Sequence, residues 1–334
     1  MPEGFTDTYD VAVVGAGPAG LSAALVLARS RRTVLLLDGG PPRNASAVRA
    51  HGVFTRDDTP PLDLKRAGLA DLQGYPVTVR PGEAQGLRRV EECFELELDG
   101  GERVRARRVL LASGLRDILP DLPGFREHWG DGVIHCPYCD GWEHRDRRLA
   151  VYGGDEAAHH MALTLRLWSG EVTLLPDGPA ELSPEQRRDL SMAGVEVGER
   201  ELERLEERPA GGGITLHFRG GDELDVDAVF YSPRQEQRSP LPARLGCTLT
   251  PSGRVEVDEC GLTSVPGVYA AGDMTPNPQY VMHASASGVT AGVAINTALI
   301  HEERAAQGAG FHHPEAEPGG HTEGEPSGGA AGMP

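Results

Sequence analysis

The sequence of 334 residues has few cysteines, few aromatic residues and no long hydrophobic run. Its five cysteines, an odd number, argue against the disulfide framework of a secreted protein. No apolar run approaches the roughly 20 residues that span a bilayer. Residues 1–7 also lack the basic and apolar regions of a secretory signal. We therefore expect a cytoplasmic protein that does not associate with a membrane.

Basic residues are scarce as well, because 32 Lys and Arg stand against 50 Asp and Glu and give a formal net charge of -18. Proteins bind nucleic acids and anionic membranes through basic surface that neutralises phosphate. We expect neither as a partner. Three of the cysteines, Cys93, Cys247 and Cys260, are isolated in the sequence, and we expect them to be small buried residues.

The first nucleotide signature follows an apolar run at residues 10–14, which is typical of a strand buried on both faces of a parallel sheet. The run ends in G-A-G-P-A-G at residues 15–20, and a helical stretch and a second apolar run at residues 33–37 complete a βαβ unit. In this context G-x-G-x-x-G predicts a dinucleotide site. Its residues are Gly15, Gly17, Pro18, Ala19 and Gly20, with Asp38 as the expected partner of the ribose hydroxyls.

A second unit of the same kind runs from residue 148 to residue 175, with a glycine pair at its turn. Apolar runs that end in Gly114 and in Gly272-Asp273 lie on either side of it. We predict an α/β fold with two doubly wound Rossmann-like dinucleotide-binding domains, the second inserted into the first. The predicted domains are residues 1–115 with 239–305, residues 116–238, and a disordered tail at residues 306–334.

Between the two signatures lies the sequence C-P-Y-C-D at residues 136–140. A C-x-x-C turn lets one thiol attack a disulfide while the second resolves the mixed disulfide. The same spacing begins many zinc sites, but no second cysteine pair is present to complete one. The sequence therefore predicts a redox-active pair, Cys136 and Cys139, and no metal.

The order of these motifs resembles that of the low-molecular-weight thioredoxin reductases over roughly residues 9–302. The resemblance implies FAD as the cofactor of the outer domain, with Asp273 at the ribityl chain, and a homodimer. It also implies that Cys139 lies against the flavin, that Cys136 attacks the substrate, and that Asp140 is the acid beside the pair. A helix N-cap is the alternative interpretation of Asp140.

The second signature departs from the reductases where they bind NADPH. The position of their third glycine is Asp155 here, and Pro176-Asp177-Gly178 replaces their His-Arg-Arg stretch. A carboxylate about 4 Å from a pyrophosphate charge costs on the order of 4 kcal/mol at an effective dielectric constant of 20. NADPH binding is thus disfavoured. The combination resembles the FAD-dependent dithiol oxidases associated with disulfide-containing natural products, in which a substrate dithiol reduces the cysteine pair, the pair reduces FAD, and oxygen takes the electrons.

Two histidines, His283 and His135, are further candidates for the site. Residues 280–284, Y-V-M-H-A, occupy the place of the reductases' Arg-Gln-Ala stretch over the flavin, which assigns His283 and Ala284 to the flavin site. His283 is either a base for an incoming dithiol or a residue that only packs on the flavin. His135 would lower the pKa of Cys136 if it were protonated, with an ordinary loop histidine as the alternative.

The sequence therefore predicts an FAD-dependent thiol-disulfide oxidoreductase that passes electrons between the cysteine pair and FAD, and that oxidises a dithiol with oxygen or another acceptor. Two alternatives stay open: an NADPH-dependent thioredoxin-disulfide reductase, and a flavin-binding redox sensor without turnover. The expected partner is a small-molecule dithiol or disulfide, or a thioredoxin-like protein.

Overall fold

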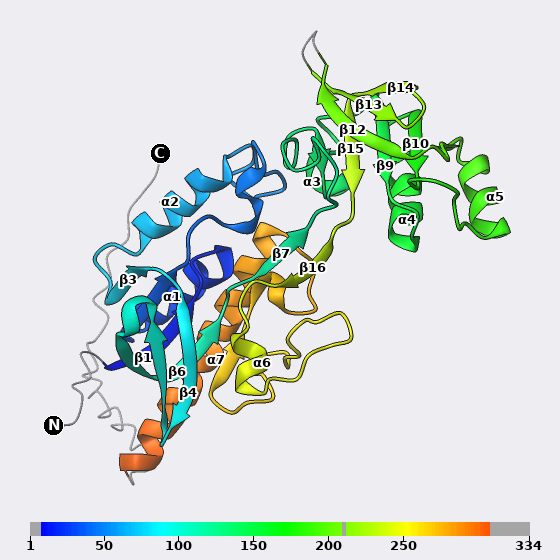
Figure 1. Ribbon diagram of the computed structural model, residues 1–334. Coiled ribbons are helices and arrows are strands. Elements are labelled where there is room, and N and C mark those ends of the chain that lie inside the picture. Colours follow the sequence, from blue (N-terminus) through cyan, green and yellow to red (C-terminus); the bar gives the residue numbers. More distant parts are fainter. Residues whose placement is uncertain (1–7, 209–211, 308–334) are drawn as a thin grey trace, which may run out of the picture. The chain divides into compact units, whose positions relative to one another are not determined.

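The computed structural model describes residues 8–208 and 212–307 (Figure 1). The chain divides into two compact units, residues 1–296 and residues 297–334. All described strands lie in the first unit, and helix α7 (Val281–Gln307) begins in the first unit and ends in the second. Residues 306 and 307, which the predicted tail included, are the last residues of α7; residues 308–334, the rest of that tail, lie outside the described part of the chain.

The larger sheet has seven strands and contains the first nucleotide signature. The strands are β1 (Thr8–Val14), β2 (Val34–Asp38), β3 (Val77–Pro81), β4 (Ala84–Val90), β5 (Cys93–Leu98), β6 (Arg103–Leu111) and β17 (Val268–Ala270). Strands β3, β2, β1 and β6 are neighbours and parallel, whereas β5 and β4 continue the sheet antiparallel. β6 pairs with β5 along its first half and with β17 along its second half.

Helices and short turns complete this part of the fold. They are α1 (Pro18–Arg29), η1 (Arg43–Ser46), α2 (Pro61–Asp71), η2 (Asp99–Gly101), α6 (Leu241–Leu245) and η3 (Gly272–Met274). Side chains of β1 alternate between two faces: Ala12 and Val14 belong to a core shared with β4, β5 and β17, and Val13 faces Gly20 of α1. The apolar runs at residues 10–14 and 33–37 therefore form central parallel strands, as the sequence predicted.

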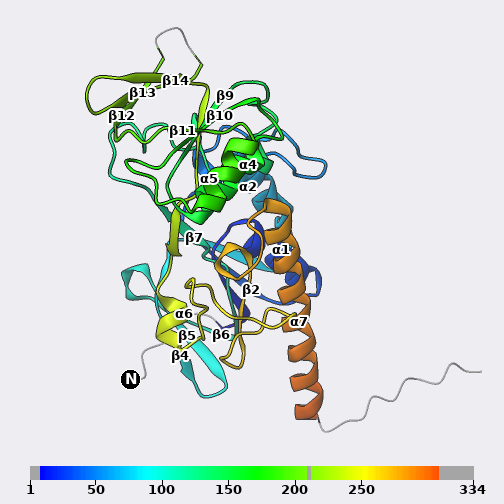
Figure 2. The same ribbon diagram turned by 90° about the vertical axis from the view of Figure 1, so that its right-hand side faces the viewer.

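The smaller parallel sheet has the order β11-β10-β9-β15-β8. Its strands are β8 (Val133–Ile134), β9 (Arg148–Tyr152), β10 (Glu171–Leu175), β11 (Glu196–Val197) and β15 (Ala228–Tyr231). Helices α4 (Glu156–Leu165) and α5 (Pro184–Met192) pack on one face (Figure 2). A three-stranded antiparallel sheet of β12 (Leu202–Glu207), β13 (Ile214–Phe218) and β14 (Glu223–Val226) covers the other face.

Two antiparallel strands, β7 (Leu115–Ile118) and β16 (Arg234–Gln237), carry the chain into and out of the segment that holds the smaller sheet (Figure 1). The predicted α/β class with two parallel nucleotide-type sheets is confirmed. The exact domain boundaries stay a prediction.

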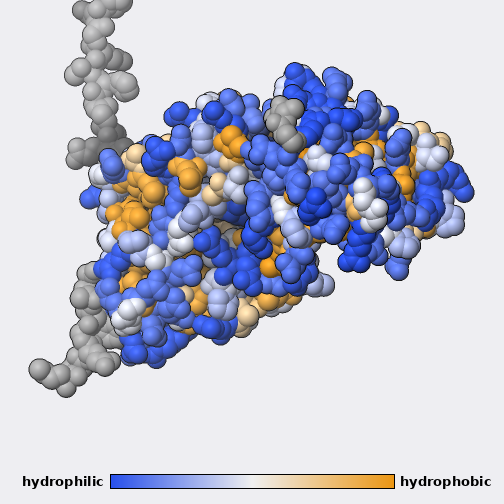
Figure 3. Space-filling model, turned by 45° about the horizontal axis from the view of Figure 1, so that its top comes forward, coloured by the Kyte–Doolittle hydropathy of each residue, from blue (hydrophilic) through white to orange (hydrophobic). Residues whose placement is uncertain are grey.

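The face drawn in Figure 3 is mainly hydrophilic, with scattered apolar patches. None of the helices in the described ranges is long and apolar enough to span a membrane. Within the same ranges, no group of His, Cys, Asp or Glu side chains has the arrangement of a metal site.

Candidate redox site

A cavity of about 260 Å³ opens beside the first glycine turn and reaches the cysteine pair. It collects residues from distant stretches of sequence, in part because the carboxyl ends of β1, β6 and β17 meet at one edge of the sheet. The predicted residues that line it are Gly15, Gly17, Pro18, Ala19, Gly114, Cys136, Cys139, Asp140, Gly272, Asp273 and Ala284. Gly20, Asp38 and His283 are not among the lining residues.

The glycines of the first turn have distinct structural roles. Gly15 has φ of 116°, and a Cβ there would stand 2.3 Å from the carbonyl oxygen of Ala112. A Cβ at Gly20 would lie only 1.8 Å from the carbonyl oxygen of Gly15. At Gly17 a Cβ would meet nothing within 4 Å, so the backbone there borders open space in the cavity. Gly15 and Gly20 allow the turn to form, and Gly17 leaves room for a ligand.

The N-terminus of α1 has no side-chain cap among the residues that the structure describes. Gly17 is the N-cap and supplies no side-chain hydrogen bond, and the first turn carries no acidic residue. The N–H groups and the positive end of the helix dipole are therefore available to a bound anion. This end of the cavity fits the pyrophosphate of a dinucleotide.

Asp38 ends β2 near the same cavity, which its neighbours Leu37, Gly39 and Gly40 line. Its Oδ1 accepts hydrogen bonds from Lys65 Nζ at 2.5 Å and from the Gly40 N–H at 2.9 Å. The Lys65 contact was not predicted, because α2 carries no motif. Binding of ribose hydroxyls by Asp38 stays a prediction.

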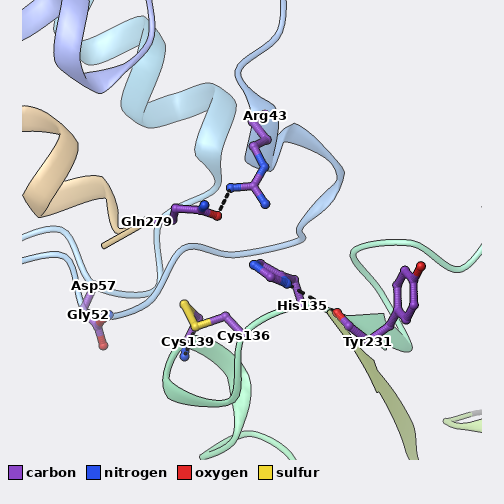
Figure 4. Close-up of a disulfide and its surroundings, with 8 residues drawn as sticks. All are labelled: Arg43, Gly52, Asp57, His135, Cys136, Cys139, Tyr231 and Gln279. Atoms are coloured by element: carbon purple, nitrogen blue, oxygen red, sulfur yellow. Dashed lines mark hydrogen bonds between the residues drawn. A yellow bond between two sulfur atoms is a disulfide. The ribbon is translucent and has the colours of Figure 1, made fainter. Parts of the chain in front are cut away.

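Cys136 and Cys139 form a disulfide at the start of the short helix α3 (Pro137–Asp140) (Figure 4). Cys136 is the N-cap, and its Sγ accepts a hydrogen bond from the Cys139 N–H at 3.2 Å. The helix cap is thus a cysteine, and Asp140 is the last residue of α3. The alternative interpretation of Asp140 as a helix N-cap was wrong.

Burial raises the pKa of Asp140 to about 6. The charge of His51 acts in the opposite direction, and the charge of Glu143 raises the pKa further. A carboxyl group with this pKa is partly protonated near neutral pH and can both donate and accept a proton. His51 also lines the cavity, but no sequence motif pointed to it.

Arg43 is a second residue that the sequence did not reveal. Its Nε and Nη2 donate to the two carboxylate oxygens of Asp117 at 2.8 and 2.7 Å. Its Nη1 donates to Asp273 Oδ2 at 3.1 Å and to Gln279 Oε1 at 2.7 Å (Figure 4). This buried guanidinium connects η1 with β7 and fixes the carboxylate of Asp273 at the cavity.

His135 does not suit the role suggested for it. Its Nδ1 lies 3.3 Å from the carbonyl oxygen of Tyr231 (Figure 4), and burial followed by the charge of Arg43 lowers its pKa. A protonated His135 that activates Cys136 is therefore disfavoured. His283 lies in the first turn of α7 with a half-buried side chain, and its role as a base stays a prediction.

Comparisons with known proteins decide the family. Residues 9–288 match the model of the pyridine nucleotide-disulphide oxidoreductases. The chain belongs to this family. It is 30% identical over 317 residues to thioredoxin reductase sirT of Leptosphaeria maculans, covering 90% of this chain and 97% of that protein. Thioredoxin reductase tcpT of Claviceps purpurea is also 30% identical, over 306 residues that cover 88% of this chain and 95% of the relative.

Solved structures agree with this result. The crystal structure of HlmI has a TM-score of 0.86 and 39% identity, and covers 91% of this chain and 97% of that one. A putative thioredoxin reductase TrxB from Bacillus anthracis has a TM-score of 0.83 and 32% identity, with coverage of 88% and 99%. The predicted resemblance to thioredoxin reductase-like enzymes is confirmed, and members of the family bind FAD.

The second glycine turn of the oxidoreductase differs from the first. Asp155 is the N-cap of α4, where its Oδ1 accepts a hydrogen bond from the Ala158 N–H at 2.9 Å, and Glu156 follows in the first turn. At the end of β10, the two carboxylate oxygens of Asp177 accept hydrogen bonds from Tyr152 Oη and the Leu202 N–H. Carboxylates of the chain itself therefore occupy this turn.

The remaining cysteines have different environments. Cys247 is buried, and burial raises the pKa of its thiol. Cys93 is half-buried and Cys260 is exposed. The expectation of a small buried residue is confirmed for Cys247 and was wrong for Cys260, which lies in a turn where its N–H donates to Asp258.

Proposed function

We propose that this oxidoreductase uses Cys136, Cys139 and FAD to oxidise a small-molecule dithiol to its disulfide, with oxygen or another oxidant as the final acceptor. The observation that carries the proposal is the Asp155 carboxylate at the N-terminus of α4. It takes the position that an anionic pyrophosphate would need, and it faces the same N–H groups. The usual electron donor of the family, a nicotinamide dinucleotide, thus meets repulsion there.

The cavity beside the first turn fits FAD. Gly15 and Gly20 permit the backbone turn, Gly17 leaves the pyrophosphate path open, and Asp273 presents a carboxylate held by Arg43. When bound there, FAD supplies the two-electron chemistry that returns the reduced cysteine pair to the disulfide.

The thiol exchange involves only the substrate dithiol and the cysteine pair of this chain. A substrate thiolate forms a bond to Cys136 Sγ, the bond between Cys136 and Cys139 breaks, and Cys139 leaves as a thiolate that takes a proton. The second substrate sulfur then attacks the first and displaces Cys136, which also takes a proton. The substrate leaves as a disulfide, and two electrons and two protons have moved to the cysteine pair.

Asp140 is placed to handle one of these protons. It directly follows Cys139 and lines the same cavity. Its raised pKa of about 6 keeps part of the population protonated near neutral pH, so the carboxyl can donate to the departing Cys139. We propose Asp140 as the acid of the exchange.

One alternative has direct support from the comparisons. The curated relatives include proteins named thioredoxin reductase. An NADPH-dependent thioredoxin-disulfide reductase would use the same disulfide with the electrons running from NADPH through FAD to the cysteines. It requires NADPH to bind despite the Asp155 carboxylate.

Anaerobic titration of the purified yellow protein tests the proposal. We expect dithiothreitol to bleach the flavin absorbance, NADPH and NADH to leave it unchanged, and air to restore it with release of hydrogen peroxide. Cys139→Ser should keep FAD bound but stop bleaching by the dithiol. Bleaching by NADPH but not by dithiothreitol would establish the reductase instead. Absence of bleaching by all three would contradict both enzymatic functions and support the flavin-binding sensor.

A further inference from the structure

His51 lines the cavity, but it belongs to no sequence motif and has no role in the thiol chemistry proposed above. It lines the cavity together with Cys136, Cys139 and Asp140, and its side chain is 15% exposed. Among the histidines of the described ranges, only His51 and His135 line this cavity. Dithiol oxidation has to move a proton away from each attacking thiol, and a histidine at this place is suited to do so.

A short closed loop holds His51. The Ala50 N–H donates to the Thr59 carbonyl oxygen at 2.9 Å, and the Gly52 N–H donates to Asp57 Oδ1 at 2.7 Å (Figure 4). Val53, two residues further along, is buried and anchors the loop. The backbone on both sides of His51 is therefore fixed by hydrogen bonds, which limits where its side chain can lie.

The charges around His51 come from the segment of the cysteine pair. Its Nε2 lies 3.9 Å from Glu143 Oε1, which is within ion-pair distance. The charge of His51 also lowers the pKa of Asp140, whereas burial, which is the larger effect, and the charge of Glu143 raise that pKa. Glu143 and Asp140 thus act on the imidazole of His51 from the segment of the cysteine pair.

His135, the other histidine at the cavity, is poorly suited to accept a proton. Burial and the charge of Arg43 lower its pKa and outweigh the opposite effects of the charge of Asp117 and of the hydrogen bond to the Tyr231 carbonyl. These two influences oppose the gain of a positive charge. The structure thus distinguishes the two rings by their surroundings.

We propose that His51 is the general base that takes the proton from the attacking substrate thiol. This inference rests on the proposed dithiol oxidation. The first substrate thiol gives its proton to His51 as its sulfur bonds to Cys136, and Asp140 gives its proton to the departing Cys139. The second thiol gives its proton to Asp140 as its sulfur displaces Cys136 from the first substrate sulfur. The departing Cys136 takes the proton from His51. Both groups end in the protonation states in which they began.

The test compares two thiols that differ in their need for a base. At pH 7, 2-mercaptoethanol is almost wholly protonated, whereas 2,2,2-trifluoroethanethiol is substantially ionised. The oxidised holoprotein is mixed anaerobically with each thiol, quenched with N-ethylmaleimide, and the mixed disulfide at Cys136 is quantified by intact mass. This readout follows the first exchange step without turnover of the flavin.

We expect His51→Gln to slow the reaction with 2-mercaptoethanol by about 10²-fold or more, the usual contribution of a general base. The reaction with trifluoroethanethiol should slow by less than about threefold, because an ionised thiol needs no base. His160→Asn, an exposed histidine of α4 that does not line the cavity, is the control and should leave both rates unchanged. Flavin absorbance and thermal unfolding check that each variant is folded.

Equal slowing with both thiols would show that His51 only maintains the structure, and unchanged rates would show that it has no role; either result overturns the inference. Thiol-dependent slowing in His135→Gln but not in His51→Gln would assign the base to His135. If the unmodified protein reacts with neither thiol, the proposed dithiol oxidation itself fails, whatever the variants do.

Discussion

The two glycine turns of this chain share their order of strand, turn and helix, yet their helices begin in opposite ways. At α1 the N-cap is Gly17, which leaves the N–H groups to the cavity; at α4 the N-cap is Asp155, which uses one of them itself. The parallel strands on either side are otherwise equivalent, since β1 pairs with β2 as β9 pairs with β10. A dinucleotide-type turn thus needs both the backbone path and an unoccupied helix terminus to bind an anion.

The largest expected effect comes from making the first turn resemble the second. Gly17→Asp places a carboxylate at the N-cap of α1, where nothing else stands within 4 Å of the new Cβ. Repulsion of the FAD pyrophosphate should cost on the order of 4 kcal/mol, or about three decades of affinity. The purified variant should be colourless but folded, as judged by absorbance and circular dichroism. A yellow protein with full FAD content would contradict the assignment of this turn.

The next largest effect is expected from a glycine-to-alanine change in each turn, because the two turns differ in how tightly they are packed. Gly20→Ala brings a Cβ within 1.8 Å of the Gly15 carbonyl oxygen, and should lower the free energy of unfolding by about 3 kcal/mol. The matched change Gly154→Ala approaches Pro176 Cβ at 3.3 Å and should cost no more than about 1 kcal/mol. Urea denaturation of both variants measures the difference. Equal losses would mean that the first turn is not more tightly packed than the second.

A smaller effect is expected from removing the charge at the second turn. Asp155→Asn keeps a good N-cap but no longer repels a phosphate. The affinity for NADPH, measured by calorimetry, should rise by about tenfold, a modest part of the full Coulomb effect because the site also lacks a basic stretch. Asp146→Asn, at an exposed turn residue, provides the control for lost charge. If both variants bind NADPH as weakly as the unchanged protein, Asp155 is not what blocks the site.

The smallest effect concerns the cap alone. Asp155→Ala removes the hydrogen bond to the Ala158 N–H and should lower the free energy of unfolding by about 1 kcal/mol, whereas Asp155→Asn should change it by a few tenths. Chemical denaturation compares the two. A stability gain in Asp155→Ala would indicate that the carboxylate strains this turn rather than capping it.

The sequence was most informative where a local pattern has one structural solution. The second unit, predicted at residues 148–175, begins with β9 and ends with β10, because continuous apolar runs are what a doubly covered parallel strand requires. The glycines at positions 15 and 20 were interpretable because the tight turn and the close packing exclude a side chain, and Gly17 because it leaves the path of a ligand open. The redox-active cysteine pair was predictable from its spacing together with the lack of a second cysteine pair for a zinc site.

The sequence was least informative where the site is assembled by tertiary structure. His51 lies in a loop and Arg43 begins the short helix η1, neither belongs to a motif, and their partners Glu143 and Asp117 are far away in the sequence. Asp140 was compatible with a cap because the register of a four-residue helix cannot be fixed by periodicity. Such residues become recognisable only when the folded chain brings their partners to them.

The pairing of β17 with β6 has a consequence for how this protein is made. Val268 pairs with Val109, so the whole smaller sheet is synthesised after β6 and before β17, the strand with which the end of β6 pairs. During that interval the smaller sheet can fold while the end of β6 is not yet paired with β17. Contacts of such long sequence separation form slowly. The cavity edge that contains Gly272 and Asp273 is consequently among the last parts of the molecule to be completed.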